Sequence, residues 1–150
     1  MAAVRKQSTP RITHADRLVD AQSGITKGEL AAYYARVAPL MLQHLRGRPV
    51  ALVRAPDGIA GELFFQKHAQ HGEMAGVGLL DPALDPGHEP LLQIDMAEGL
   101  LGAAQFNVVE FHTWNALSRA FAQPDRMTFD LDPGEGVESV SYTHLRSHET

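Results

Sequence analysis

The sequence predicts an α/β or α+β domain, because short β-prone runs alternate loosely with two helical segments along its 150 residues. The length corresponds to one domain, and 44% hydrophobic with 21% charged residues is ordinary for a soluble globular protein. No apolar run approaches the ~18 residues of a membrane span, and the first ten residues lack the apolar core of a secretory signal. The absence of cysteine fits a reducing cytoplasm.

The helical segments are predicted at residues 26–47 and 96–105, after a mobile basic leader at 1–11. Thr26 and Glu29 have the spacing of a capping box at the start of the first helix. Pro39 should kink or interrupt that helix, and Gly47 should end it. Apolar residues at helical spacing predict its buried face: Leu30, Tyr33, Val37, Leu40, Met41 and Leu45.

Five strands are predicted from short β-prone runs bounded by turn residues. They are residues 50–54, 62–67, 91–95, 108–112 and 127–132. Repeated Asp-Pro and Pro-Gly turn signals make residues 69–90 mostly a loop.

Charge is distributed unevenly along the chain, whose net charge is −5. Residues 1–48 carry eight Lys or Arg against three acidic residues, and residues 49–150 carry five against fifteen. A basic first third suits contacts with phosphate, and an acidic remainder suits metal ligation. Chance segregation of solvated charges is the alternative, so the asymmetry decides nothing alone.

The most informative stretch is Met127-Thr-Phe-Asp130-Leu-Asp132, which Pro133-Gly134 ends. Side chains alternate along a strand, so Asp130 and Asp132 would point the same way at the strand end. Two carboxylates held together repel unless a hard cation such as Mg²⁺ or Mn²⁺ lies between them. For an isolated Asp-x-Asp pair, a solvated acidic turn is the alternative.

Several segments together resemble one family over residues 12–137. They are Gly24-Ile-Thr-Lys-Gly-Glu-Leu, Tyr33-Tyr-Ala-Arg-Val-Ala-Pro, Leu45-Arg-Gly-Arg-Pro-Val, Val53-Arg-Ala-Pro-Asp-Gly-Ile, Phe64-Phe-Gln-Lys-His, Phe111-His-Thr-Trp-Asn-Ala and Pro124-Asp-Arg-Met-Thr-Phe-Asp-Leu-Asp-Pro-Gly-Glu-Gly-Val. Their order and spacing are similar to the polymerase domain of bacterial ATP-dependent DNA ligase D. That domain belongs to the archaeo-eukaryotic primase superfamily and acts in non-homologous end joining.

The resemblance implies a primase-like domain, with a central mixed sheet flanked by helices, that adds nucleotides to a 3′ end at a DNA break. Asp130 and Asp132 match the first two metal-ligating aspartates of a two-metal site for Mg²⁺ or Mn²⁺. The implied partners are DNA ends with a 5′ phosphate, nucleoside triphosphates, and the Ku protein and ligase domain of a parent protein, with no membrane. The implied location is the cytoplasm, at the nucleoid during repair.

Further residues match the family's DNA contacts. Arg17 and Lys27 match basic positions that hold the 5′ phosphate of a recessed end, and the start of a helix at Lys27 would itself attract phosphate. Phe64 and Phe65 match paired aromatics that stack on template bases. The alternatives are ordinary surface cations and aromatics packed under loops.

The nucleotide contacts implied by the resemblance are His112, Arg54 and Lys67. An imidazole at His112 could donate a hydrogen bond to phosphate or ribose, and a structural histidine is the alternative. Asp95, His68 and His71 are interpreted as structural or solvated residues.

The resemblance stops after residue 137. The family's third catalytic carboxylate and its Ser-Gly-x-Lys-Gly-x-His nucleotide-binding segment do not occur in the sequence. We therefore expect an N-terminal part of a larger enzyme, nearly inactive alone, with a non-native or disordered tail at 138–150. His144 and His148 in that tail are four apart, as zinc ligands on a helix can be, but have no third ligand nearby.

Two other functions stay open from the residues. The basic leader, Arg17, Lys27 and the paired phenylalanines could bind a 5′-phosphorylated DNA end without catalysis. Alternatively, Asp-Leu-Asp after a strand could serve a metal-dependent phosphohydrolase, although that motif usually lies near the start of its domain.

Overall fold

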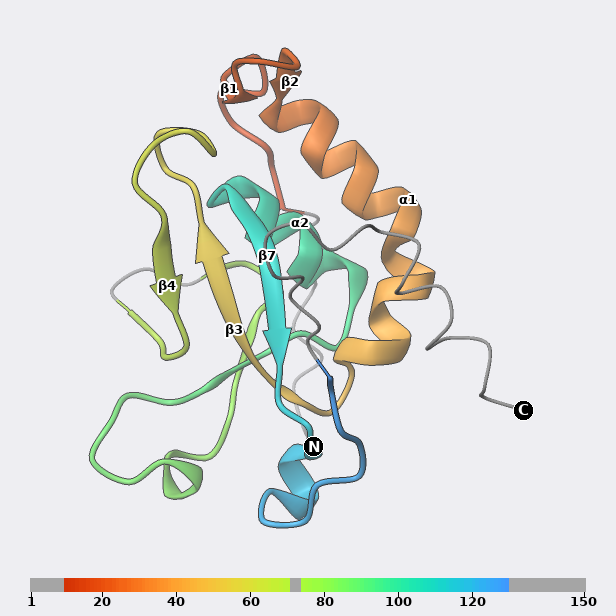
Figure 1. Ribbon diagram of the computed structural model, residues 1–150, viewed down its shortest axis with the longest axis vertical. Helices are drawn as coiled ribbons and strands as arrows, with labels where there is room; N and C mark the ends of the chain where they lie inside the picture. The colour runs from red at the N-terminus through yellow and green to blue at the C-terminus, as the bar shows by residue number, and fades with distance from the viewer. Residues whose placement is uncertain (1–9, 71–73, 130–150) are drawn as a thin grey trace, which may run out of the picture.

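Strand β3 (Pro49–Arg54) is the centre of a five-stranded antiparallel sheet. The computed structural model describes residues 10–70 and 74–129. Strand β4 (Phe64–Gln66) pairs with the second half of β3, β6 (Leu92–Gln93) pairs with its start, and β7 (Val108–Thr113) pairs along most of its length. Strand β5 (Gly78–Leu79) extends the sheet beyond β6. In Figure 1, β3 lies between β4 and β7.

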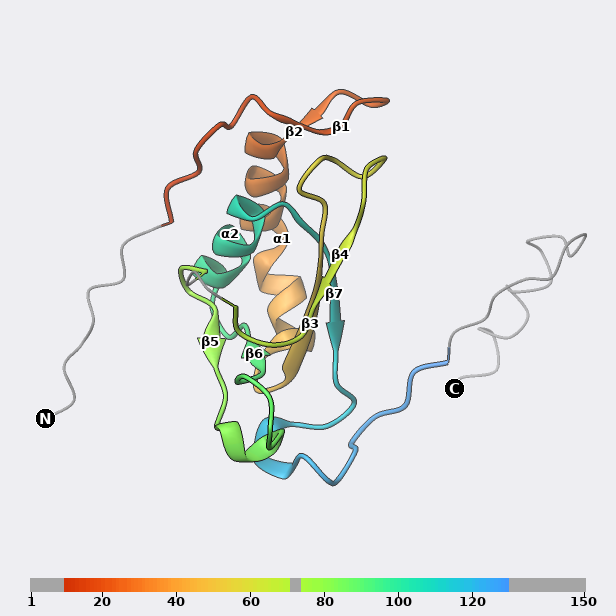
Figure 2. The same cartoon turned by 90° about the vertical axis from the view of Figure 1, so that its left-hand side faces the viewer.

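Helices α1 (Lys27–Leu45) and α2 (Ala97–Gln105) pack on the same side of the sheet (Figure 2). Before α1, strands β1 (Leu18–Asp20) and β2 (Ile25–Thr26) form a small hairpin that the sequence did not predict. Two 3₁₀ turns, η1 (Pro82–Leu84) and η2 (Ser118–Ala120), lie in the connections. The mixed α/β architecture confirms the predicted fold class.

The start of α1 has the predicted capping box. Thr26 Oγ1 accepts a hydrogen bond from the backbone N–H of Glu29 at 3.3 Å, and the Glu29 carboxylate accepts one from the backbone N–H of Thr26 at 2.8 Å. The predicted interruption at Pro39 is wrong, because the helix continues to Leu45. Proline removes the N–H that would bond to Ala35, and Ala35 is exposed, so water can satisfy its carbonyl.

The predicted buried face of α1 is confirmed at Leu45, and Leu30 and Met41 pack partly buried against the core, but the prediction is wrong at two positions. Tyr33 and Leu40 are exposed, whereas the buried positions are Lys27, Ala31, Tyr34, Ala38, Leu42 and Leu45. Small side chains at Ala31 and Ala38 are compatible with close packing of α2 against α1. Tyr34 carries the contact with the sheet: its hydroxyl donates a hydrogen bond to Val108 O at 2.7 Å, and its ring lies edge-on to Phe111.

Helix α2 also approaches the segment after residue 74 unusually closely. A Cβ atom added at Gly102 would lie 2.0 Å from Ala75 O, which no side chain can tolerate. Glycine at this position therefore lets the start of the 74–90 loop rest directly on the helix.

The predicted strands at 50–54, 62–67, 91–95 and 108–112 are confirmed in type; the second and third are shorter than predicted, and the first and fourth each extend one residue further. In the described part of the fifth, residues 127–129 have no regular secondary structure, so that part of the prediction is wrong. Met127 and Phe129 are exposed and pair with no strand, so no ladder extends this segment. Most of the predicted leader, His71 and the 138–150 tail lie outside the described residues. Among the residues described, no helix is long and apolar enough to cross a membrane.

Candidate functional site

The register of the sheet separates two faces. Leu52 pairs with Phe111, and Phe111 contacts Tyr34 of α1, so these side chains lie on the helix-covered face. Val53 pairs with Phe65 on one side and with Glu110 on the other. Because paired residues share a face and successive residues alternate, Phe65, Glu110 and His112 lie on the opposite, open face.

The open-face residues contact one another. The rings of Phe65 and His112 lie 6.0 Å apart between centroids at an angle of 64°, and His112 Nε2 lies 2.7 Å from Glu110 Oε2. Phe65 is 59% exposed, so most of an aromatic surface is open to a ligand. An exposed ring beside an imidazole can stack on a nucleobase and donate to phosphate or ribose. The carboxylate of Glu110 orients the imidazole.

Phe64 and Arg54 lie on the other face. Arg54 is partly buried: it donates to Phe106 O at 3.3 Å and to Gln66 Oε1 at 3.2 Å, and its guanidinium lies over the rings of Phe64 and Phe106. Burial lowers the pKa of Arg54. Of the predicted nucleic-acid contacts, Phe65 and His112 therefore lie together on the open face. Arg54 lies on the opposite face, and Lys67 is exposed just after β4.

Arg17 and Lys27 lie near each other at the start of α1. Lys27 Nζ donates to Thr13 O at 3.0 Å, and Arg17 donates to Asp57 Oδ1 at 3.2 Å and to Pro56 O. Burial, and then the charge of Arg17, lower the pKa of Lys27. Two cations held this closely repel each other, and an anion bound near both would relieve that repulsion.

The N–H groups at the start of α1 are already occupied. The N–H of Lys27 donates to Arg17 O at 2.8 Å, that of Gly28 donates to Ala15 O at 2.8 Å, and that of Glu29 donates to Thr26. The expectation that the helix terminus itself would hold phosphate is therefore wrong for these three donors. Arg17 is the exposed cation of this region, whereas Lys27 is buried and its ammonium donates to Thr13 O.

Asp130 and Asp132 lie outside the described residues. The segment just before them is firmly attached: Arg48 makes two hydrogen bonds of 2.7 Å to the Asp125 carboxylate, and Arg126 donates to Trp114 O at 3.2 Å and to Thr113. The hydrogen bond from Arg48 lowers the pKa of Asp125. Residues 125 and 126 are thus held near the end of β7.

Sequence reasoning missed this ion pair, because Arg48 and Asp125 are 77 residues apart and lie in two separate motifs whose spacing does not reveal that they meet. It also missed Glu110, whose role is visible only once alternation along β7 is known. The structural interpretation of Asp95 is confirmed, since its carboxylate accepts the N–H of Gly47 at 2.8 Å and its carbonyl accepts Arg46 Nε at 2.9 Å.

Comparison with known proteins decides the family. Residues 26–146 match the sequence model of the LigD primase-polymerase domain. The chain belongs to this family. A multifunctional non-homologous end joining protein LigD from Pseudomonas aeruginosa is 58% identical over 123 residues, covering 82% of the chain and 15% of that relative. Its namesake from Mycolicibacterium smegmatis is 34% identical over 141 residues, covering 93% of the chain and 18% of that relative.

A solved structure of the polymerase domain from Mycobacterium tuberculosis Ligase D, in complex with DNA, matches with a TM-score of 0.66 and 32% identity. The match covers 73% of this chain and 38% of that one. This LigD-family chain therefore spans less than a fifth of the two end-joining relatives and less than half of the matched structure.

We predict that Asp125→Asn lowers the free energy of unfolding of this LigD-family chain at neutral pH, because the substitution removes the charge that pairs with Arg48. The folded-state pKa of Asp125 lies below its ordinary value of 3.8, so the ion pair stabilises the fold above that value and is lost as the pH falls through the lowered pKa. Urea unfolding at a series of pH values should show the wild-type and variant curves converging at acidic pH.

Asp57→Asn is the matched control. Its partner Arg17 is 51% exposed, whereas Arg48 is 11% exposed, and exposed pairs contribute little. Equal effects of the two substitutions, or a gap between wild type and Asp125→Asn that persists in acid, would contradict this account of the segment.

Proposed function

We propose that this chain binds broken DNA ends and takes part in template-directed addition of nucleotides to a 3′ end during non-homologous end joining. Support comes from the family, from relatives named for end joining, and from a related structure that holds DNA. Nucleoside triphosphates, the Ku protein and a ligase domain are the partners we propose with it. The observation that carries the proposal is the contact between Phe65 and His112 on the open face of the sheet.

The open face has side chains for both a template base and the incoming nucleotide that pairs with it. Phe65 would stack on a template base, and stacking on an aromatic side chain accepts any base, so it needs no sequence preference. His112, oriented by Glu110 at 2.7 Å, would donate to the phosphate or ribose of the incoming nucleotide. Lys67 would extend the contacts with DNA along the edge formed by β4, whereas Phe64 lies under Arg54 on the other face, so the stacking role falls to Phe65.

Asp130 and Asp132 would hold the Mg²⁺ or Mn²⁺ that this reaction needs. Divalent ions at such a site activate the attacking 3′ hydroxyl and neutralise the leaving pyrophosphate. The carboxylates are hard oxygen ligands, which these ions prefer.

Arg17 and Lys27 would bind the 5′ phosphate on the far side of a gap or recessed end. Burial and the nearby charge of Arg17 lower the pKa of Lys27, an anion bound near both cations would offset their repulsion, and Arg17 is exposed enough to reach one. End binding alone, without catalysis, is the second candidate function, and this pair of cations is the observation that favours it.

The proposed metal site predicts that the chain binds Mn²⁺ and that substitution of Asp130 and Asp132 weakens this binding. Titration of the chain with Mn²⁺, followed by the loss of the electron paramagnetic resonance signal of the free ion, should show weak binding. We expect the double variant Asp130→Asn/Asp132→Asn to lose one class of sites or bind it more than about tenfold more weakly, since even loss of an outer partner costs that much.

Glu62→Gln is the control for that titration, because Glu62 is an exposed carboxylate in the loop before β4. Its titration should follow the wild type. A double variant that binds as much Mn²⁺ as the wild type would remove Asp130 and Asp132 from the proposed function.

The proposed binding of a 5′ phosphate by Arg17 and Lys27 predicts that the chain prefers phosphorylated DNA ends. Fluorescence anisotropy should show tighter binding to recessed DNA ends with a 5′ phosphate than to ends without one. Arg17→Ala and Lys27→Ala should each abolish most of this preference, because each removes one of the cations facing the phosphate.

Arg36→Ala, an exposed cation on α1, controls for unspecific charge and should weaken binding to both ends equally. Lys27 is buried, so circular dichroism should confirm that its variant folds, and Arg17→Ala tests the same idea from an exposed position. Equal affinity for both ends in the wild type would exclude the 5′-phosphate site.

A further inference from the structure

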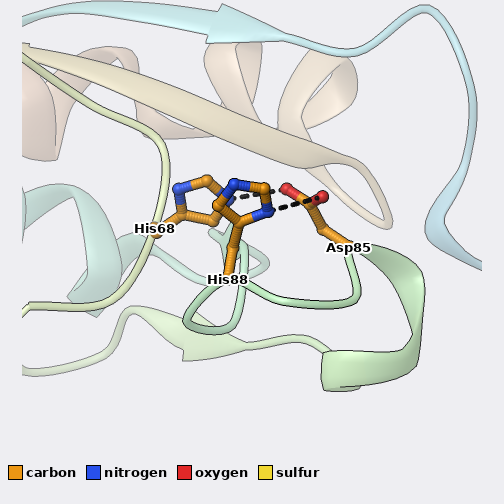
Figure 3. Close-up of side chains that lie close together, drawn as sticks. All are labelled: His68, Asp85 and His88. Carbon is orange, nitrogen blue, oxygen red and sulfur yellow. Dashed lines mark hydrogen bonds and ion pairs between the residues drawn. The ribbon is translucent and has the colours of Figure 1, made fainter.

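Three metal-ligating side chains meet at the loop before β6, away from the open face. His68 Nε2 lies 2.7 Å from Asp85 Oδ2, and His88 Nδ1 lies 3.1 Å from Asp85 Oδ1. The three ligand atoms all lie within 4.8 Å of one another. In Figure 3 both imidazoles turn a nitrogen toward the same carboxylate.

The backbone preorganises two of these ligands. Asp85-Pro-Gly-His88 is a tight turn in which the His88 N–H donates to Asp85 O at 3.3 Å. Gly87 has φ +89, the left-handed conformation that glycine adopts at the third position of a type II turn after proline. The turn places the side chains of Asp85 and His88 together before any ion binds.

The third ligand comes from a separate segment that is also held in place. His68 follows β4 and forms an isolated antiparallel bridge with Leu91, and its carbonyl accepts the Gln66 side chain at 3.1 Å. The adjacent Ala69 N–H donates to Pro90 O at 2.7 Å. The rings of His68 and His88 stack nearly parallel, with centroids 5.0 Å apart and 9° between planes, and each directs one nitrogen to an oxygen of the Asp85 carboxylate.

The spacing suits a tetrahedral ion. Nitrogen and oxygen ligands lie ~2.1 Å from Zn²⁺, which puts neighbouring ligand atoms of a tetrahedron about 3.4 Å apart. The two measured separations from Asp85 are 2.7 and 3.1 Å, so small side-chain movements would admit the ion. His88 is 57% exposed, which leaves an approach for the ion and space for water in the remaining position.

We propose that His68, Asp85 and His88 bind a divalent transition-metal ion of the zinc class through three protein ligands and water. Imidazole nitrogen favours Zn²⁺, Co²⁺ or Ni²⁺ over Mg²⁺, so this site differs in chemistry from the carboxylate pair at Asp130 and Asp132. The ion would tie the end of β4 to the turn before β6 and so fasten the loop between them. The three ligands come together only in the folded chain, so the ion would bind the folded chain and not the unfolded one. Its binding would therefore stabilise the fold.

The test uses the chain freed of metal with a chelator. Calorimetric titration with Zn²⁺, and visible absorption on titration with Co²⁺, should show one equivalent bound at this site with the spectrum of a tetrahedral ion. His88→Ala and Asp85→Asn should each lose that equivalent or bind it more than about tenfold more weakly. Zn²⁺ should raise the melting temperature of the wild type and not that of His88→Ala.

Two controls separate this site from the rest of the chain. His44→Ala removes an exposed histidine of α1, and Asp130→Asn/Asp132→Asn removes the proposed Mg²⁺ or Mn²⁺ ligands, and both should bind Zn²⁺ as the wild type does. Melting of each variant in chelator shows whether it folds, and the exposed His88 position also allows His88→Gln. Absence of Zn²⁺ binding in the wild type, or unchanged binding in the folded His88 variants, would overturn the proposal.

Discussion

The pairing of β3 with β4 and β7 is the constraint on which the open face depends. Two helices cover one face of this sheet, and Tyr34 fastens α1 to it through Val108 and Phe111. Alternation along the strands then sends every second side chain to the other face. A one-residue shift of β4 would turn Phe65 toward the core, and a one-residue shift of β7 would do the same to His112, so the core fixes the site.

Most elements could be predicted from the sequence, because their signals are local. The capping box at Thr26 and the β-prone run of β3 need no tertiary information. The buried face of α1 was partly misplaced because large residues were taken as the core, whereas Ala31 and Ala38 are buried and Leu40 is not. The β1–β2 hairpin was missed because its strands are too short to show a period.

Some residues of the candidate site could likewise be predicted from the sequence, and others became visible only in the structure. Phe65, His112, Arg17 and Lys27 could be predicted only from the resemblance to a family, and residues 26–146 match the model of that family. The pairing of Arg48 with Asp125 and the meeting of His68 with Asp85 and His88 join residues far apart in sequence, which composition and spacing cannot reveal. Arg54 carried the right charge for phosphate, yet burial commits it to Phe106 and Gln66.

The central claim is that the face of the sheet opposite the helices receives the template. The most direct measurement places 2-aminopurine in the template overhang and follows the change in its fluorescence as the base stacks on protein. The account predicts strong quenching on binding to the wild type, lost in Phe65→Ala and largely kept in Phe64→Ala, because only Phe65 lies on the open face. Quenching that survives in Phe65→Ala, or that depends only on Phe64, would contradict it.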